Sequence, residues 1–149
     1  MPDLITTLSE SVTLNGSVRG STNTVTTNNI VDVMERIVTC THSQVTTIAT
    51  FAAAPYTSPG AIDVDRTKYI RVTNLSATEV VDIGVVTTNT NYQVVLTAGN
   101  SHILCQADTT AIGEADTDPA FGTLENITSI EIIPRATTDA QVELFVGLI

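Results

Sequence analysis

The chain has 149 residues, 42 % of them hydrophobic, which is enough for one domain with a sizeable core and excludes a disordered polymer. Its formal net charge of −10 argues against direct binding of nucleic acid, because phosphate backbones are bound through Lys and Arg, of which there are only six. No apolar run approaches the roughly 18 residues of a membrane span, and the polar, acidic N-terminus does not read as a signal peptide.

Threonine dominates the composition, with 27 residues that alternate with Val and Ile through most of the chain. β-Branched side chains fit a pleated, half-buried surface, and Thr is tolerated on either face of a sheet. The composition therefore predicts an all-β fold.

The first 29 residues are more polar than the rest. Asn15-Gly16 lies between apolar–polar alternations, a strong hairpin signal because both residue types accept a positive φ. The following GSTNTVTTNN has few large apolar residues. We expect residues 1–29 to form an arm or edge hairpin and residues 30–149 to form a single β-sandwich domain.

The segment after the arm supports two interpretations. Ile30, Val33, Met34 and Ile37 have helical spacing, with Asn29 as a possible N-cap. The β-branched content favours an extended strand instead. Both interpretations remain open at this point.

From Ile37 onwards the hydrophobic period is two, with turn signals between the runs. The loop PYTSPG contains two prolines that cannot donate to a sheet ladder. A hairpin loop, TAGN, is expected between residues 92–96 and 101–106. About eight strands of this kind predict an antiparallel β-sandwich, jelly-roll-like in its connections. The expected strands are residues 36–42, 45–52, 68–75, 79–86, 92–96, 101–106, 127–133 and 141–148.

Four residues are of types that bind zinc, namely Cys40, His42, His102 and Cys105. His102 and Cys105 are an odd number of residues apart, so they point to opposite faces of a strand, and a zinc site is disfavoured. Two cysteines do not make a disulfide framework. We expect Cys40 and Cys105 to be two buried thiols, with one cross-strand disulfide as the alternative.

Alternate carboxylates occur at Asp63 and Asp65 and again in the loop IGEADTDPAFG, at Glu114, Asp116 and Asp118. Such oxygens could hold a hard cation, but the Gly and terminal Glu of an EF-hand are missing. The favoured interpretation is a solvated acidic loop, with calcium as the alternative. We therefore assign no metal-ligating residues.

Signatures of catalysis are missing from the sequence. There is no nucleophile elbow, no P-loop and no G-x-G-x-x-G. Six aromatic residues are few for the sugar-binding platforms of a glycosidase. We expect a protein that is not an enzyme, with no catalytic residues, no cofactor-binding residues and no cofactor.

Two segments carry a family resemblance. KYIRVTNLSATEVVDIGV, residues 68–85, and YQVVLTAGNSHIL, residues 92–104, resemble a pattern of small structural proteins from tailed, particularly marine, bacteriophages. Members of that class are similar to jelly-roll sandwiches that decorate or cement capsids, or form part of tails and fibres. The resemblance directly covers about a third of the chain.

The resemblance implies a non-enzymatic virion structural protein, most specifically a capsid decoration or cement protein. Its partners would be the major capsid protein or other virion proteins, it would be a homotrimer, and it would lie on the exterior of the capsid after assembly in the host cytoplasm. Neither nucleic acid nor membrane is an expected partner. The alternatives are a tail, baseplate or fibre component, and a carbohydrate-binding β-sandwich. Contacts are expected in the arm and in the C-terminal strand, which ends near Ile149.

Overall fold

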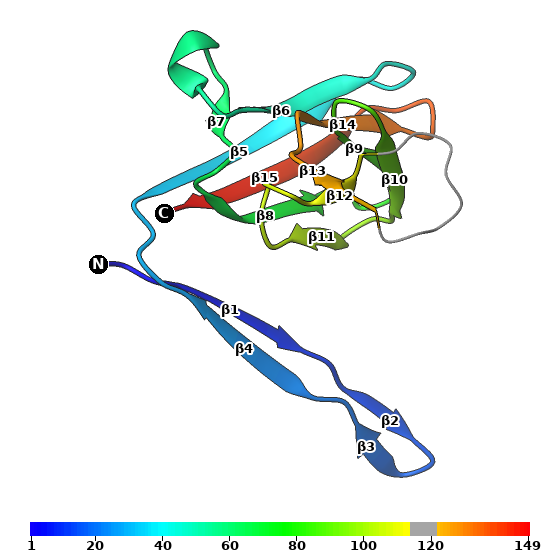
Figure 1. Cartoon of the computed structure of the whole chain (residues 1–149). Coiled ribbons are helices and arrows are strands. Elements are labelled where there is room, and N and C mark those ends of the chain that lie inside the picture. The colour runs from blue at the N-terminus through cyan, green and yellow to red at the C-terminus, as the bar shows by residue number, and fades with distance from the viewer. Residues whose placement is uncertain (114–121) are drawn as a thin grey trace.

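The computed structural model describes residues 1–113 and 122–149, and consists of a β-sandwich with a long β-ribbon at its N-terminus (Figure 1). The described residues contain strands and one short 3₁₀ turn, η1 (Pro55–Thr57), but no α-helix. The all-β prediction is confirmed.

Two sheets make up the sandwich. The four-stranded sheet has the order β11-β8-β15-β5, and the five-stranded sheet has the order β10-β9-β14-β6-β7. Neighbouring strands are antiparallel except for β6 and β7. The four-stranded sheet consists of β5 (Asp32–Cys40), β8 (Thr67–Asn74), β11 (Ser101–Leu104) and β15 (Ala140–Leu148). The five-stranded sheet consists of β6 (Thr46–Ala52), β7 (Ile62–Asp63), β9 (Val81–Val86), β10 (Asn91–Leu96) and β14 (Ser129–Pro134), and a small separate pair joins β12 (Ala111–Ile112) to β13 (Leu124–Glu125).

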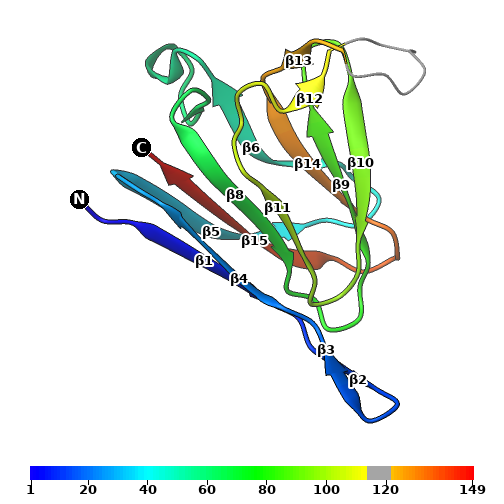
Figure 2. The ribbon, with the colours of Figure 1, turned by 60° about the horizontal axis from the view of Figure 1, so that its bottom comes forward.

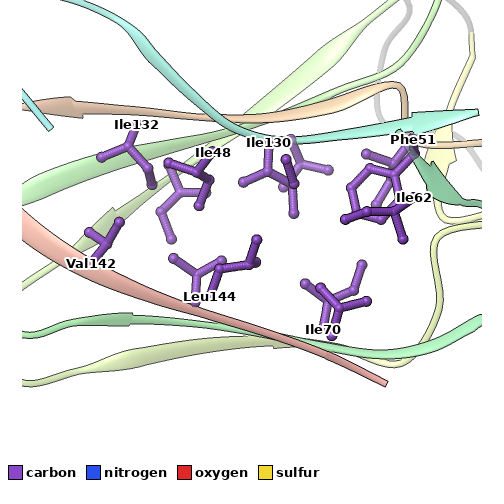
Figure 3. Packing of buried hydrophobic residues seen from close by; sticks show 14 of the residues in the cluster. Ile48, Phe51, Ile62, Ile70, Ile130, Ile132, Val142 and Leu144 are labelled. Atoms are coloured by element: carbon purple, nitrogen blue, oxygen red, sulfur yellow. The ribbon is translucent and has the colours of Figure 1, made fainter. Parts of the chain in front are cut away.

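The core lies between the two sheets. Every second side chain of a strand points inward, as expected for the predicted period of two. Figure 3 shows the inward side chains of the two sheets facing one another. Full burial of one such aliphatic side chain contributes about 1.5–3 kcal/mol, so this layer holds the sandwich together. Its central members are Ile48, Ile70, Val81, Ile83, Val85, Ile130, Ile132, Val142 and Leu144.

The segment that follows the arm is a strand. β5 pairs with β15 over its whole length, from Asp32 opposite Leu148 to Cys40 opposite Ala140. Nine residues of antiparallel pairing outweigh the helical spacing of a few apolar side chains, since helix propensity is a weak prior. The extended interpretation is therefore confirmed and the helical one is wrong.

The predicted hairpin between β10 and β11 is also wrong, because the two strands belong to different sheets. The loop at residues 97–100 crosses between the sheets and is tied to the end of β8. The amide N–H of Gly99 donates to the Asn74 carbonyl, and the amide N–H of Asn74 donates to the Asn100 carbonyl, each at 2.9 Å. The Gly turn was recognised correctly, but the strands on its two sides found other partners.

The buried side chain of Asn74 fixes this crossing. Its Nδ2 donates to the carbonyl oxygens of Glu79 at 2.7 Å and Leu96 at 3.1 Å, and its Oδ1 accepts from the amide of Ser76 at 3.1 Å. The fully buried side-chain amide of Asn74 thus joins the end of β8 to the segment that leads into β9 and to the end of β10.

The arm, residues 1–29, is a two-stranded ribbon that projects beyond the sandwich (Figures 1 and 2). β1 (Leu4–Ser9) pairs with β4 (Thr22–Thr27), and β2 (Val12–Leu14) pairs with β3 (Ser17–Arg19). The turn forms at the predicted place, with φ of 50° at Asn15 and 78° at Gly16. Between the two pairs Gly20 has φ of 137°, and a Cβ there would lie 2.0 Å from the Glu10 carbonyl oxygen.

Candidate interaction surface

The four residues of zinc-binding type are dispersed and bonded elsewhere. The ring Nδ1 of His42 lies 2.8 Å from Asp139 Oδ1, and the ring Nε2 of His102 lies 3.3 Å from the Tyr92 hydroxyl. In the described ranges no group of three or more metal-ligating side chains occurs. Burial lowers the pKa of His102 and raises the pKa of Tyr92, which favours two neutral partners at neutral pH.

The two cysteines differ from one another. Both thiols are free, Cys40 is buried in the core and Cys105 is exposed. The expectation of two buried thiols is therefore correct for Cys40 and wrong for Cys105, and the alternative of a disulfide is wrong. Burial raises the pKa of the Cys40 thiol, so it stays protonated and serves as a small apolar core residue.

The first pair of acidic residues has a local structural role. Asp63 Oδ1 accepts hydrogen bonds from the backbone amides of Asp65 at 3.1 Å and Arg66 at 3.3 Å, which closes the turn before β8. Glu114, Asp116 and Asp118 lie outside the described residues.

The arm has two chemically different faces. Cross-strand partners share a face, so Leu8 and Val25 lie on the same side of the ribbon as Leu4. We call this side the apolar face of the arm. The opposite side carries Ile5 near the root and otherwise hydroxyl side chains, of which Thr7 lies 3.1 Å from Thr24 (Oγ1 to Oγ1). Leu8 is 56 % exposed and Val25 is 53 % exposed, so the described residues leave most of the apolar face uncovered.

The root of the arm rests on the outer face of the four-stranded sheet. A Cβ at Gly147 of β15 would lie 3.5 Å from both Leu4 Cδ2 and Ile30 Cδ1, so the missing side chain leaves room for Leu4. The carbonyl of Pro2 accepts from the Ile30 amide at 2.9 Å, which joins the start and end of the arm. A cavity of about 270 Å³ separates residues 4–7 from Tyr69, Arg71 and Phe145.

That outer face combines aromatic, aliphatic and charged side chains. The rings of Tyr69 and Phe145 meet edge to face with centroids 5.9 Å apart, and the Arg71 guanidinium lies 5.7 Å from the Phe145 centroid. Arg71 also bonds Glu143, so its charge is balanced within the face. Along β5 the outward side chain of Ile37 is 61 % exposed.

The sequence did not identify this outer face, although contacts were expected in the C-terminal strand, which forms part of it. Alternate residues of β5 form one row that points inward. Val33 and Ile37 belong to the other row, which points outward, and their apolar side chains were the signal in the sequence for this second face. A strand with apolar side chains on both sides is expected to be buried on both faces. The other strands that contribute to this face could be identified only from the order of the strands in the sheet.

No family model matches the chain, and no curated protein or solved structure is significantly similar to it. The resemblance of residues 68–85 and 92–104 to phage structural proteins therefore remains an expectation. No helix in the described ranges has the length and hydropathy to cross a membrane.

Proposed function

We propose that the chain is a non-enzymatic assembly subunit, specifically a capsid decoration or cement protein of a tailed phage. The observation that carries the proposal is the arm, which presents exposed aliphatic side chains on a ribbon that extends beyond the sandwich (Figure 1). Exposed apolar surface of this kind marks sites of protein association. A rigid body with a reaching arm suits attachment to a preformed lattice, since little entropy is lost by the body on docking.

The proposal includes jelly-roll connectivity, which the strand pairs support. Among the described strands the first and last long strands of the sandwich, β5 and β15, pair with each other. The same nesting continues inward through β6 with β14, β8 with β11, and β9 with β10. A long antiparallel ribbon that is rolled up in this way gives two four-stranded sheets and is the plan of a jelly roll, which is common in capsid proteins.

The charge favours the outside of a capsid. A net charge of −10 would be repelled by packaged nucleic acid, whereas the exterior imposes no such cost. The proposed partners are the major capsid protein and two further copies of this chain, arranged as a trimer, and the proposed location is the virion exterior. Closed symmetry of this kind limits growth to a defined oligomer.

The test uses capsids assembled from the major capsid protein that the same genome encodes. The full chain and a variant that lacks residues 1–29 would be mixed with these capsids and sedimented. We expect the full chain to co-sediment and the truncated chain to remain in the supernatant, although its circular dichroism still reports a cooperatively unfolding β-domain. Full-length chain that stays in the supernatant would exclude the decoration role, and immunogold labelling confined to tails would assign it to the tail instead.

A further inference from the structure

The arm is not a self-sufficient structure. It exposes aliphatic side chains on both halves of the ribbon, and isolated two-stranded ribbons are marginally stable in water. Beyond its root the ribbon leaves the sandwich (Figure 1), and the arm side of the cavity against the sheet is formed by residues 4–7. The outer part of the arm therefore needs a surface to pack on. The large exposed aliphatic residues of the whole arm are Ile5, Leu8, Val12, Leu14, Val18 and Val25.

A suitable surface exists on the outer face of the four-stranded sheet. Its row along β5 consists of Val33, 46 % exposed, Glu35 and Ile37, and its centre contains Phe145, which lies opposite Glu35. The same face already accepts Leu4 at Gly147. The apolar face of the arm is thus compatible with this sheet. The contact between them ends at the root, although exposed apolar side chains continue along the arm and along the sheet.

Electrostatics favour the arm over the body as the contacting element. Residues 1–29 contain two acidic residues and one basic residue, a net charge of −1, so residues 30–149 carry the other −9 of the total −10. Neither β1 nor β4 contains an ionisable side chain. Two bodies of like charge repel when they approach face to face, whereas a neutral ribbon can approach an acidic body at little electrostatic cost.

We infer that the arm of one copy docks the exposed part of its apolar face, formed by Leu8 and Val25, on the outer face of the four-stranded sheet of a second copy. The occupant is a second copy because every chain carries an arm whose outer part is exposed and a sheet face that its own arm meets only at the root. Leu8 and Val25 pack over Ile37 and Phe145 of the acceptor. The inference rests on the self-association part of the proposed function and is independent of attachment to a capsid.

The first experiment measures the solution mass of the full chain by light scattering after gel filtration, over a range of concentrations. Leu8→Asp places a charge in the contact, and we expect it to raise the dissociation constant by about tenfold or more, since the burial of one leucine side chain is lost. Ser9→Asp is the matched control, because it adds the same charge at the next residue on the hydroxyl face. It should change the constant by no more than about threefold.

The acceptor side has its own pair of variants. Ile37→Asp should weaken association as Leu8→Asp does. Val45→Asp is the control, because Val45 is 60 % exposed, close to the 61 % of Ile37, but borders the outer face of the five-stranded sheet. We expect thermal unfolding of each variant to show an intact sandwich, because all four substituted residues lie on the surface.

The decisive measurement mixes the two weakened variants. Leu8→Asp retains a good sheet face and Ile37→Asp retains a good arm, so an equimolar mixture should form a species of twice the 15.7 kDa chain mass at a concentration where each variant alone is monomeric. A mixture that stays monomeric would refute arm-to-face docking. An oligomer whose mass neither variant changes would also refute it while leaving self-association intact, and a wild-type chain that is monomeric throughout would refute both.

Discussion

Replacing Asn74 by alanine should destabilise the sandwich without changing its topology. The variant loses the hydrogen bonds to the carbonyls of Glu79 and Leu96 and to the amide of Ser76. Each contributes about 1 kcal/mol, so the free energy of unfolding should fall by about 3 kcal/mol. For a chain of this length that loss lowers Tm by about 6–12 °C.

Urea unfolding followed by circular dichroism measures this loss, and an unchanged m-value would show that the native state is equally compact. Asn100→Ala is the matched control, because its side chain bonds the Thr97 hydroxyl at the exposed surface of the same loop. It should cost no more than about 0.5 kcal/mol. If both variants lose the same stability, the argument that the buried amide holds the crossing between β10 and β11 is refuted.

Three further predictions concern other parts of the molecule. The backbone amide and then the ring of His42 hold the pKa of Asp139 below its usual value. The resulting stabilisation is complete above the usual Asp pKa of about 3.9 and is lost as pH falls through the lower folded pKa, so Asp139→Asn should shrink the acid-induced loss of stability seen by urea titration. A thiol reagent should modify Cys105 at once and Cys40 only on unfolding, as mass spectrometry would show; equal rates would contradict the assigned burial. Gly20→Ala should open the middle of the arm to proteases while leaving the sandwich Tm unchanged, because its Cβ would collide with a backbone oxygen across the ribbon.

The strands of the sandwich were predictable because each is buried on one face, so that their hydrophobic period is visible in the sequence. Val81, Ile83 and Val85 were assigned inward and are fully buried. The turn at Asn15 and Gly16 was predictable for a different reason. A tight hairpin turn needs a positive φ at both central residues, and this requirement is met by the two residue types themselves.

Long-range partners were not predictable in the same way. The loop at residues 97–100 has the composition of a hairpin, and only the pairing of β10 with β9 and of β11 with β8 shows that it crosses between the sheets. The exposure of Cys105, just beyond the end of β11, depends likewise on where a strand stops. The candidate interaction surface combines residues from β5, β8 and β15, which are neighbours only through the sheet order.

The charge distribution explains why an arm is a suitable means of association for this chain. Each copy carries −10, and at physiological ionic strength the repulsion between two copies is largely screened beyond about 8 Å and opposes closer approach of their charged bodies. Attraction must then come from short-range burial of apolar surface. A thin ribbon with neutral strands can bring Leu8 and Val25 within contact distance while its own acidic body remains farther away. The same aliphatic residues on a surface of the body would bring two −9 charges together.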